Sequence, residues 1–160
     1  AYYLGLLKDK SGDSKSALLY YEESLTLEVD NYKKASILYK IAVKFKTRGL
    51  KTKSRQYARK ALKFQPSMGK AYLLIANLYA SSANDCGETQ FEKRSIYWLA
   101  AKQARKAANV DPSTKKTALS MAKSYEGRAP TRTDIFTEGK EGQIIIFSCW
   151  LKDKITVPKL

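Results

Sequence analysis

Apolar side chains in residues 35–66 recur with the period of two short amphipathic helices. The first predicted helix carries its apolar residues at i, i+3, i+4 and i+7, one face of a helix: Leu38, Ile41, Ala42 and Phe45. The second repeats this spacing after Gly49, and it ends at Pro66 because proline lacks the amide hydrogen that a helix interior needs. The stretch therefore predicts a helix–turn–helix unit.

The same order of large and small residues returns after a shift of 34 residues. After the shift, each large residue aligns with a large one and each small residue with a small one. Leu38, Ile41, Ala42 and Phe45 align with Tyr72, Ile75, Ala76 and Tyr79. A fixed period of 34 residues is typical of one class of helix–turn–helix repeat. In these residues the chain resembles the tetratricopeptide repeat (TPR) family.

The resemblance implies an all-α fold, a right-handed TPR superhelix of about three and a half repeats. The composition of the tail adds a small C-terminal β-hairpin. The expected array spans residues 1–129, and the expected tail spans residues 130–160. An insertion after Tyr79 lengthens the third repeat, and a terminal half-repeat covers the open apolar end of the array. The expected repeats lie near residues 1–31, 32–66 and 67–112, with a capping helix at 113–126.

The inserted stretch introduces an unusually long helix. Thr89 and Glu92 have the spacing of a capping box, and the helix that they begin runs to about Val110. Its first half is enriched in large side chains that need to be covered: Phe91, Ile96, Tyr97 and Trp98.

The tail is the expected cover. Residues 143–151 are rich in β-branched and aromatic side chains, residues 152–154 are expected to turn, and residues 155–157 return. An isolated hairpin is only marginally stable in water, so we expect it to lie against the helices. If left exposed, Ile144 to Phe147 would be prone to aggregation.

Several short motifs from residue 86 onward are similar to a group of TPR proteins of the Bacteroidota that end in a tail with a Cys-Trp pair. The resemblance implies export to the periplasm and a role in protein–protein interaction. The sequence departs from the group at Ser148 and Pro158. The matching motifs are Cys86-Gly87, Phe91-Glu92-Lys93, Tyr97-Trp98, Val110-Asp111-Pro112-Ser113, Asp134-Ile135-Phe136, Glu141-Gly142, Cys149-Trp150 and Thr156-Val157.

The net charge of +15 favours an acidic partner, although a solvated basic surface gives the same composition. An acidic protein or peptide is the expected partner, and nucleic acid or another anionic surface is the alternative. The alternative would use the basic run on the outer face of the second repeat. That run consists of Lys51, Lys53, Arg55, Arg59, Lys60 and Lys63.

Composition argues against catalysis. The chain has no histidine, which removes the usual general base and the histidine-activated nucleophiles. Its two cysteines have no zinc spacing, so neither a cofactor nor a metal is expected. No apolar run is long enough to span a membrane. Because Ala1 falls inside a repeat, we expect the chain to be part of a longer protein whose signal peptide lies outside it.

In TPR domains the first helices of successive repeats line a concave groove, so the resemblance implies a peptide-binding surface. Its residues would anchor an extended or helical peptide through aromatic, aliphatic, lysine and asparagine side chains. The alternative is that several of them pack against neighbouring helices. Carried over by repeat position, the groove residues are Tyr2, Leu6, Asp9, Ser36, Tyr39, Val43, Lys46, Lys70, Leu73 and Asn77.

We also predict a disulfide between Cys86 and Cys149. The first lies in the insertion, and the second lies in the tail that should cover the helix after it. Export, which the resemblance implies, would bring both thiols into oxidising conditions. The alternative is two unrelated buried thiols, since free cysteine packs as a small apolar residue.

Overall fold

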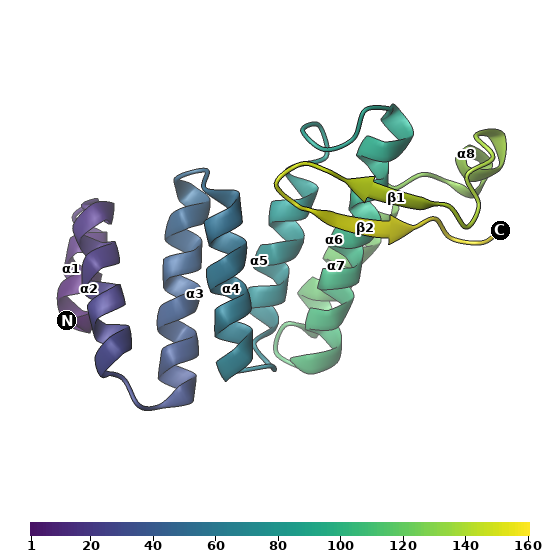
Figure 1. The fold of residues 1–160 in the computed structure, drawn as a ribbon. Coiled ribbons are helices and arrows are strands. Elements are labelled where there is room, and N and C mark those ends of the chain that lie inside the picture. Colours follow the sequence, from purple (N-terminus) through teal and green to yellow (C-terminus); the bar gives the residue numbers. More distant parts are fainter. The chain divides into compact units, whose positions relative to one another are not determined.

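The computed structural model describes all 160 residues and confirms an all-α fold that ends in a small β-hairpin. The chain forms eight helices followed by two strands. Figure 1 labels them in chain order. Two compact units, residues 1–71 and 72–160, are described separately below. The elements are α1 (Tyr2–Lys10), α2 (Ser14–Leu27), α3 (Asn31–Thr47), α4 (Lys51–Phe64), α5 (Gly69–Ala80), α6 (Gln90–Val110), α7 (Lys115–Glu126), α8 (Arg132–Thr137), β1 (Ile144–Phe147) and β2 (Asp153–Thr156).

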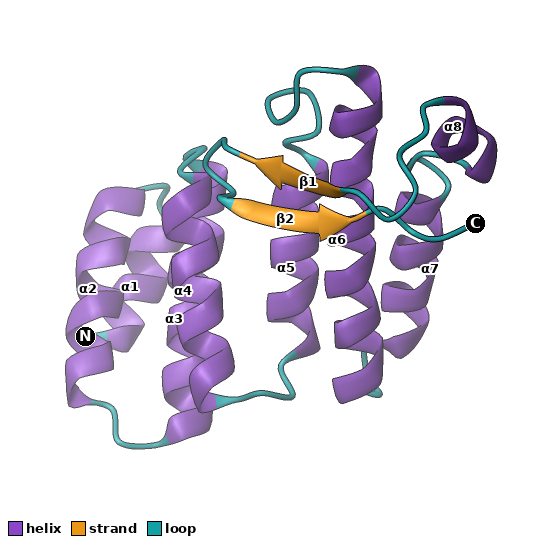
Figure 2. Ribbon diagram, turned by 45° about the vertical axis from the view of Figure 1, so that its right-hand side comes forward, coloured by secondary structure: helices purple, strands orange, loops and turns teal.

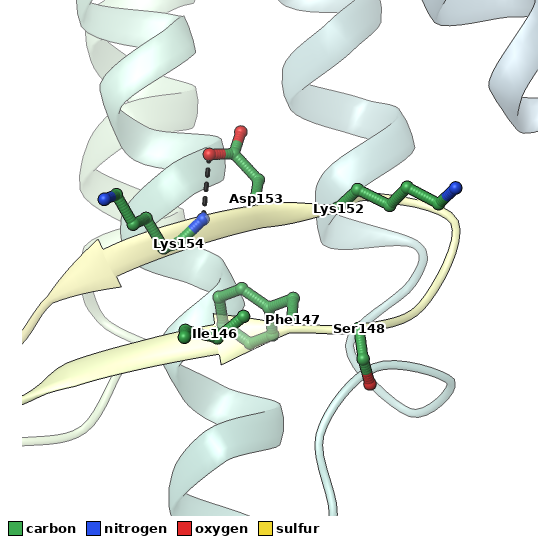
Figure 3. A pocket seen from close by; sticks show the side chains of 6 residues that line it. All are labelled: Ile146, Phe147, Ser148, Lys152, Asp153 and Lys154. Atoms are coloured by element: carbon green, nitrogen blue, oxygen red, sulfur yellow. Dashed lines mark hydrogen bonds between the residues drawn. The ribbon is translucent and has the colours of Figure 1, made fainter.

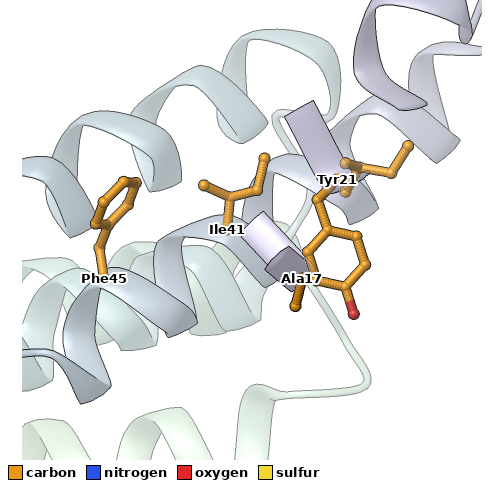
Figure 4. Close-up of a cluster of buried hydrophobic side chains, with 5 residues drawn as sticks. Ala17, Tyr21, Ile41 and Phe45 are labelled. Atoms are coloured by element: carbon orange, nitrogen blue, oxygen red, sulfur yellow. The ribbon is translucent and has the colours of Figure 1, made fainter. Parts of the chain in front are cut away.

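The first unit is built on the predicted apolar positions. Tyr21 of α2 is fully buried with Ile41 and Phe45 of α3 in one cluster (Figure 4). A second cluster joins Leu38 of α3 to Ala61 of α4. Because these residues lie one helical turn apart on their helices, the helix–turn–helix period of the sequence becomes a continuous core.

Small residues permit close contacts between helices in this unit. A Cβ at Gly5 would come within 2.8 Å of the Tyr21 ring. Ser54 is fully buried, and its hydroxyl donates to the Ala42 carbonyl at 2.8 Å, which satisfies its polar atom. Tyr57 supplies the aromatic packing that Ala58 lacks, since its ring centroid lies 5.2 Å from that of Phe45.

The second unit centres on the long helix α6. Its N-terminus carries the predicted capping box between Thr89 and Glu92. Along its second half, buried alanines such as Ala104 and Ala107 allow the backbone of α7 to approach closely. Helix α7 lies within residues 113–126, where the sequence predicts a capping helix, and its Ala118 packs in a cluster with Ala107.

Arg94 links α6 to the short helix α8. Its guanidinium donates to the carbonyls of Arg128 and Ala129, at 3.1 and 2.9 Å, and to Asp134 at 3.0 Å. Hydrogen bonds to the backbone and side chain of Thr131 lower the pKa of the Asp134 carboxyl, and the charge of Arg94 adds to the effect.

The hairpin packs against α6 through β2, as Figure 2 also shows. Ile145 and Phe147 are buried, as expected for a covering element. The predicted position of the turn was wrong. Phe147 pairs with Asp153, so the chain turns over residues 148–152 and not over 152–154.

The insertion holds this turn in place. Cys149 lies in the turn and not in the strand, and it forms a disulfide with Cys86 of the inserted loop, the pairing that the sequence predicts. The two Cα atoms are 5.5 Å apart. The indole N–H of Trp150 donates to the Ser82 hydroxyl at 3.0 Å. Because of these contacts, residues 149 and 150 belong to the turn and not to the strand. Lys152 adopts a positive φ of 44° just before β2 begins.

Candidate functional site

One face of α3 carries the central residues of the predicted groove. Ser36, Tyr39 and Val43 lie one helical turn apart, so their side chains share a face. All three are half-buried, and Lys40 lies beside them on the same helix. Five lysines and no carboxylate occur along α3, so this helix presents positive charge to any ligand.

Tyr2 of α1 joins this face through Lys40. The ammonium group donates to the Tyr2 hydroxyl at 2.6 Å and lies 4.9 Å from the ring centroid. An ammonium at this distance is attracted to the negative face of an aromatic ring. The contact holds a cation and a phenol side by side on the surface of the first unit.

Tyr39 makes a second pair of the same kind. The Lys70 ammonium lies 4.7 Å from the centroid of the Tyr39 ring. Tyr2 and Tyr39 occupy equivalent positions of successive repeats, 37 residues apart, and each ring is covered by a lysine from the following first helix. Partial burial raises the pKa of the Tyr39 phenol, which favours the neutral form of this side chain.

Asp9 closes the other end of this face. It forms an ion pair with Lys44 of α3, and the Tyr21 hydroxyl donates to it at 3.3 Å. The acidic side chain predicted for the groove therefore has its charge already neutralised. A carboxylate on a ligand would meet Lys40 and Lys70 and would not be repelled by Asp9.

A cavity of about 370 Å³ lies next to Tyr2. It brings the predicted groove residues Tyr2 and Ser36 together with a lysine and a glutamate. Its volume suits one or two side chains of a peptide. The cavity is lined by Tyr2, Tyr3, Glu28, Lys33, Ser36 and Ile37.

The other predicted groove residues lie in different surroundings. Leu6 packs against the buried cluster around Tyr21, and Lys46 is exposed near the end of α3. In the second unit, Leu73 packs against Ala107, Ala108 and Ala118. Asn77 is within hydrogen-bonding reach of the Tyr125 hydroxyl. A role in binding remains a prediction for all four.

Sequence reasoning missed Lys40 and Lys44. Both lie outside the positions that line TPR grooves, yet both meet residues of α1. The signal was the i, i+4 spacing of the two lysines, which places them on one face of α3. The sequence alone did not reveal which residues of another helix that face would meet.

The basic run predicted on the outer face lies on α4. A cavity of about 530 Å³ there is lined by four cationic side chains and by no carboxylate. Two lysines of this helix also lie over rings, Lys53 over Phe45 at 5.3 Å and Lys60 over Tyr57 at 4.8 Å. The cavity residues are Thr52, Arg55, Gln56, Arg59, Lys60 and Lys63.

No group of three or more histidine, cysteine or acidic side chains is arranged to hold a metal ion. None of the helices combines the length and the apolar character that a membrane crossing requires.

Comparison with known proteins finds relatives that share about two thirds of their length with this chain. It is 32% identical over 110 residues to the photosystem I assembly protein Ycf3 of Cyanophora paradoxa, an alignment that covers 63% of this chain and 64% of the relative. The Ycf3 proteins of Cuscuta gronovii and Cuscuta obtusiflora are each 28% identical over 114 residues, with 66% of both chains covered. The chain thus spans just under two thirds of the length of these relatives. No protein-family model matches it. Together with the paired helices, these relatives support a helical repeat of the tetratricopeptide type.

Proposed function

We propose that the protein is a non-enzymatic scaffold that binds an extended, acidic protein segment on the face formed by α1 and α3. The observation that carries the proposal is the repetition of one arrangement, a tyrosine covered by a lysine, in the Tyr2–Lys40 and Tyr39–Lys70 pairs. Each pair offers an ammonium and a phenol to a carboxylate. Two pairs in succession suit a ligand that runs along the repeats.

Charge favours an acidic ligand. The chain carries 30 basic and 15 acidic residues, and the Asp9 carboxylate beside this face is paired with Lys44. The positive potential of this protein would speed its association with an acidic segment and would repel a basic one. The relatives support a role in protein interaction, because they are named for the assembly of a protein complex.

Binding to synthetic peptides tests this proposal. A fluorescent peptide that alternates glutamate with small apolar residues should bind, and its glutamine version should bind much more weakly. Replacing both Lys40 and Lys70 with alanine should weaken binding of the acidic peptide roughly two- to tenfold, as expected for the loss of two charge contacts near the surface. Thermal unfolding should stay close to that of the unmodified protein because both lysines keep their side chains near the surface.

A matched variant separates a specific site from general attraction. Lys63→Ala combined with Lys123→Ala removes the same charge from exposed positions of α4 and α7. This variant should bind the acidic peptide almost as well as the unmodified protein. Equal losses in the two double variants would mean that net charge alone attracts the peptide, and the α1–α3 site would be wrong.

The alternative function is binding of nucleic acid or another anionic surface through α4. The observation in its favour is the cavity lined by Arg55, Arg59, Lys60 and Lys63 without a carboxylate. Neutralising several phosphates makes affinity fall steeply with salt. A gel-retardation assay with duplex and single-stranded DNA at two salt concentrations tests this function. Tight binding that Lys60→Glu and Lys63→Glu abolish would favour the alternative over the scaffold.

We also propose that the protein works in an oxidising compartment, such as the periplasm. The disulfide between Cys86 and Cys149 supports this location, because such bonds persist outside reducing compartments. Thiol alkylation of the protein in intact cells, followed by mass measurement, tests it. Both cysteines should resist alkylation until a reductant is added, and two free thiols in freshly lysed cells would contradict the proposal.

A further inference from the structure

The cavity next to Tyr2 is bounded by three large side chains. Two of them are the rings of Tyr2 and Tyr3, whose centroids lie 6.0 Å apart with their planes at 71°. The third is Ile37, the most buried residue of the lining, which is 4% exposed and packs in the cluster around Tyr21. Tyr3, in contrast, is 80% exposed, so most of its ring is in water. An apolar side chain of a ligand would therefore bury apolar surface in this cavity.

The polar residues of the cavity do not oppose an apolar ligand group. The Glu28 carboxylate accepts hydrogen bonds from the backbone N–H groups of Val29 and Asp30, both at 3.0 Å. It keeps these partners when an apolar side chain enters, so no charge is left buried without a partner. Lys33 is exposed and adds positive charge at the edge of the cavity.

The next repeat carries a lysine at the position of Ser36. Ser36 and Lys70 are 34 residues apart and occupy equivalent positions, as Tyr2 and Tyr39 do. The Lys70 ammonium lies 4.7 Å from the centroid of the Tyr39 ring, so its side chain covers that ring. Ser36 is too short to cover the Tyr2 ring, and both residues instead line the cavity. A longer side chain at position 36 is therefore expected to fill it.

Lys40 places a cation one helical turn from the cavity. It follows Ser36 by four residues on the same face of α3, a rise of about 6 Å along the helix. The ammonium donates to the Tyr2 hydroxyl, which uses one of its three N–H donors and leaves two for a ligand. In an extended chain, alternate side chains share a face and lie about 6.5–7 Å apart. A carboxylate two residues from an apolar side chain in the cavity would therefore reach Lys40.

We propose that the cavity at Tyr2 anchors an aromatic side chain of the acidic segment, two residues from a glutamate or aspartate that binds Lys40. The ring would pack against Tyr2 and Tyr3 in the edge-to-face or offset arrangements that aromatic pairs favour. This inference rests on the proposed function, which assigns an acidic segment to the face of α1 and α3. It adds the side chain and the spacing that the segment needs for tight binding.

The cavity beside the hairpin is less suited to such a ring. Figure 3 shows its lining side chains, all of which come from β1, β2 and the turn between them. The one aromatic residue of that lining, Phe147, is buried, so its ring offers little surface to a ligand. The cavity at Tyr2 instead lies between residues of two helices and includes an exposed tyrosine ring. An aromatic side chain should therefore prefer the cavity of the first unit.

Fluorescence polarisation with three synthetic peptides tests the proposal. The first is Glu-Ala-Glu-Ala-Phe-Ala-Glu-Ala-Glu, in which the ring lies two residues from a glutamate in both directions. In the second, alanine replaces phenylalanine, and binding should be about tenfold weaker because one buried ring is lost. The third, Glu-Ala-Glu-Phe-Ala-Ala-Glu-Ala-Glu, has the composition of the first but turns its ring to the face opposite the glutamates. It should bind as weakly as the second.

A pair of variants locates the ring. Ser36→Met fills the cavity with a side chain about as long as that of Lys70 and adds no charge, so the first and second peptides should bind this variant equally. Ser120→Met makes the same substitution at an exposed position of α7 and should retain the preference for the first peptide. On the unmodified protein, the first peptide should shift the NMR signals of the Ile37 methyl groups, and the second should not. Thermal unfolding checks that both variants fold.

The possible failures separate this inference from the proposed function. If none of the three peptides binds, both are wrong. If the first and second peptides bind equally well, the aromatic anchor is wrong and the proposed function stands, because the acidic segment still binds. If the third peptide binds as tightly as the first, the spacing to Lys40 is wrong. A Ser36→Met variant that still prefers the first peptide would place the ring outside the cavity and would also overturn the inference.

Discussion

The indole N–H of Trp150 donates to the hydroxyl of Ser82 at 3.0 Å and links the turn of the hairpin to the inserted loop. Ser82 is fully buried, and its own hydroxyl donates to the Leu78 carbonyl at 2.8 Å. The contact therefore continues a hydrogen-bonded chain from α5 into the tail. It brings together two segments that are 68 residues apart in the sequence.

Replacing Trp150 with phenylalanine should keep the aromatic contact with Tyr79 but remove the hydrogen bond to Ser82. We expect the free energy of unfolding to fall by about 1 kcal/mol more than it does for Trp98→Phe. Trp98 is the matched control because it makes an edge-to-face contact with Phe91, at 6.1 Å between ring centroids. Urea denaturation measures both values, and equal losses would mean that the hydrogen bond contributes nothing to stability.

Removing the disulfide should destabilise the protein. The bond closes a loop with a sequence separation of 63 residues, which corresponds to about 4 kcal/mol in the chain-entropy model. We expect a clear drop in the unfolding midpoint for Cys86→Ser combined with Cys149→Ser. A reductant should lower the midpoint of the unmodified protein to the same value and leave the double variant unchanged. An unmodified protein that resists the reductant would show that packing alone holds the hairpin.

Gly5→Ala should reduce stability, although alanine normally favours a helix over glycine by about 1 kcal/mol. The added methyl group would come within 2.8 Å of two Tyr21 ring carbons, so the buried ring would have to move. We expect a loss of about 1–3 kcal/mol from this overpacking. Gly127→Ala is the control, since its nearest atom outside the neighbouring residues is 3.5 Å away. A stabilised Gly5→Ala variant would contradict the close contact.

Tyr21 should make the protein sensitive to alkaline pH. Burial, aided by the charge of Asp9, raises the pKa of its phenol from 10.0 to about 12. Between these values the folded protein keeps the phenol proton more tightly than the unfolded chain does, so stability is lost as the pH rises through this window. A tenfold difference in proton affinity between the two states corresponds to about 1.4 kcal/mol, so the loss should not exceed a few kcal/mol.

Tyr21→Phe isolates this effect from the titration of lysines and other tyrosines. The variant should lose less free energy of unfolding between pH 10 and pH 12 than the unmodified protein does. Chemical denaturation at several pH values provides the comparison. Parallel curves for the two proteins would mean that the Tyr21 phenol titrates normally in the folded state.

The position of the hairpin turn illustrates where sequence reasoning fails. Residues 143–151 have the composition of one continuous strand, and no local signal separates Phe147 from Cys149. Strand β1 ends at Phe147 because Cys149 forms a disulfide with Cys86 and Trp150 donates a hydrogen bond to Ser82. The strand is shortened by partners more than 60 residues away, which local propensity does not register.

Some residues of the candidate site were likewise predicted from the sequence, and others were found only in the structure. Ser36, Tyr39 and Val43 were predicted as groove residues by the repeat positions that the TPR resemblance implies, and they share a face of α3. The lysines that cover the two tyrosines were not both predicted, since Lys40 lies outside the positions that line TPR grooves. A long lysine side chain can take many directions from its helix, so its contact depends on what the neighbouring helix places within reach.

By itself, the sequence determined the order and the approximate bounds of the helices, the capping box of the long helix and the residues of the core. These features depend on spacings of a few residues, which can be read from the sequence. For example, α4 runs from Lys51 to Phe64, where the apolar periodicity predicts a helix. Only the tertiary structure decided the register of β1 on β2 and the side chains that meet across elements. Such contacts, from Tyr2 with Lys40 to Trp150 with Ser82, join residues 38 to 68 positions apart, and their geometry exists only once the helices have packed.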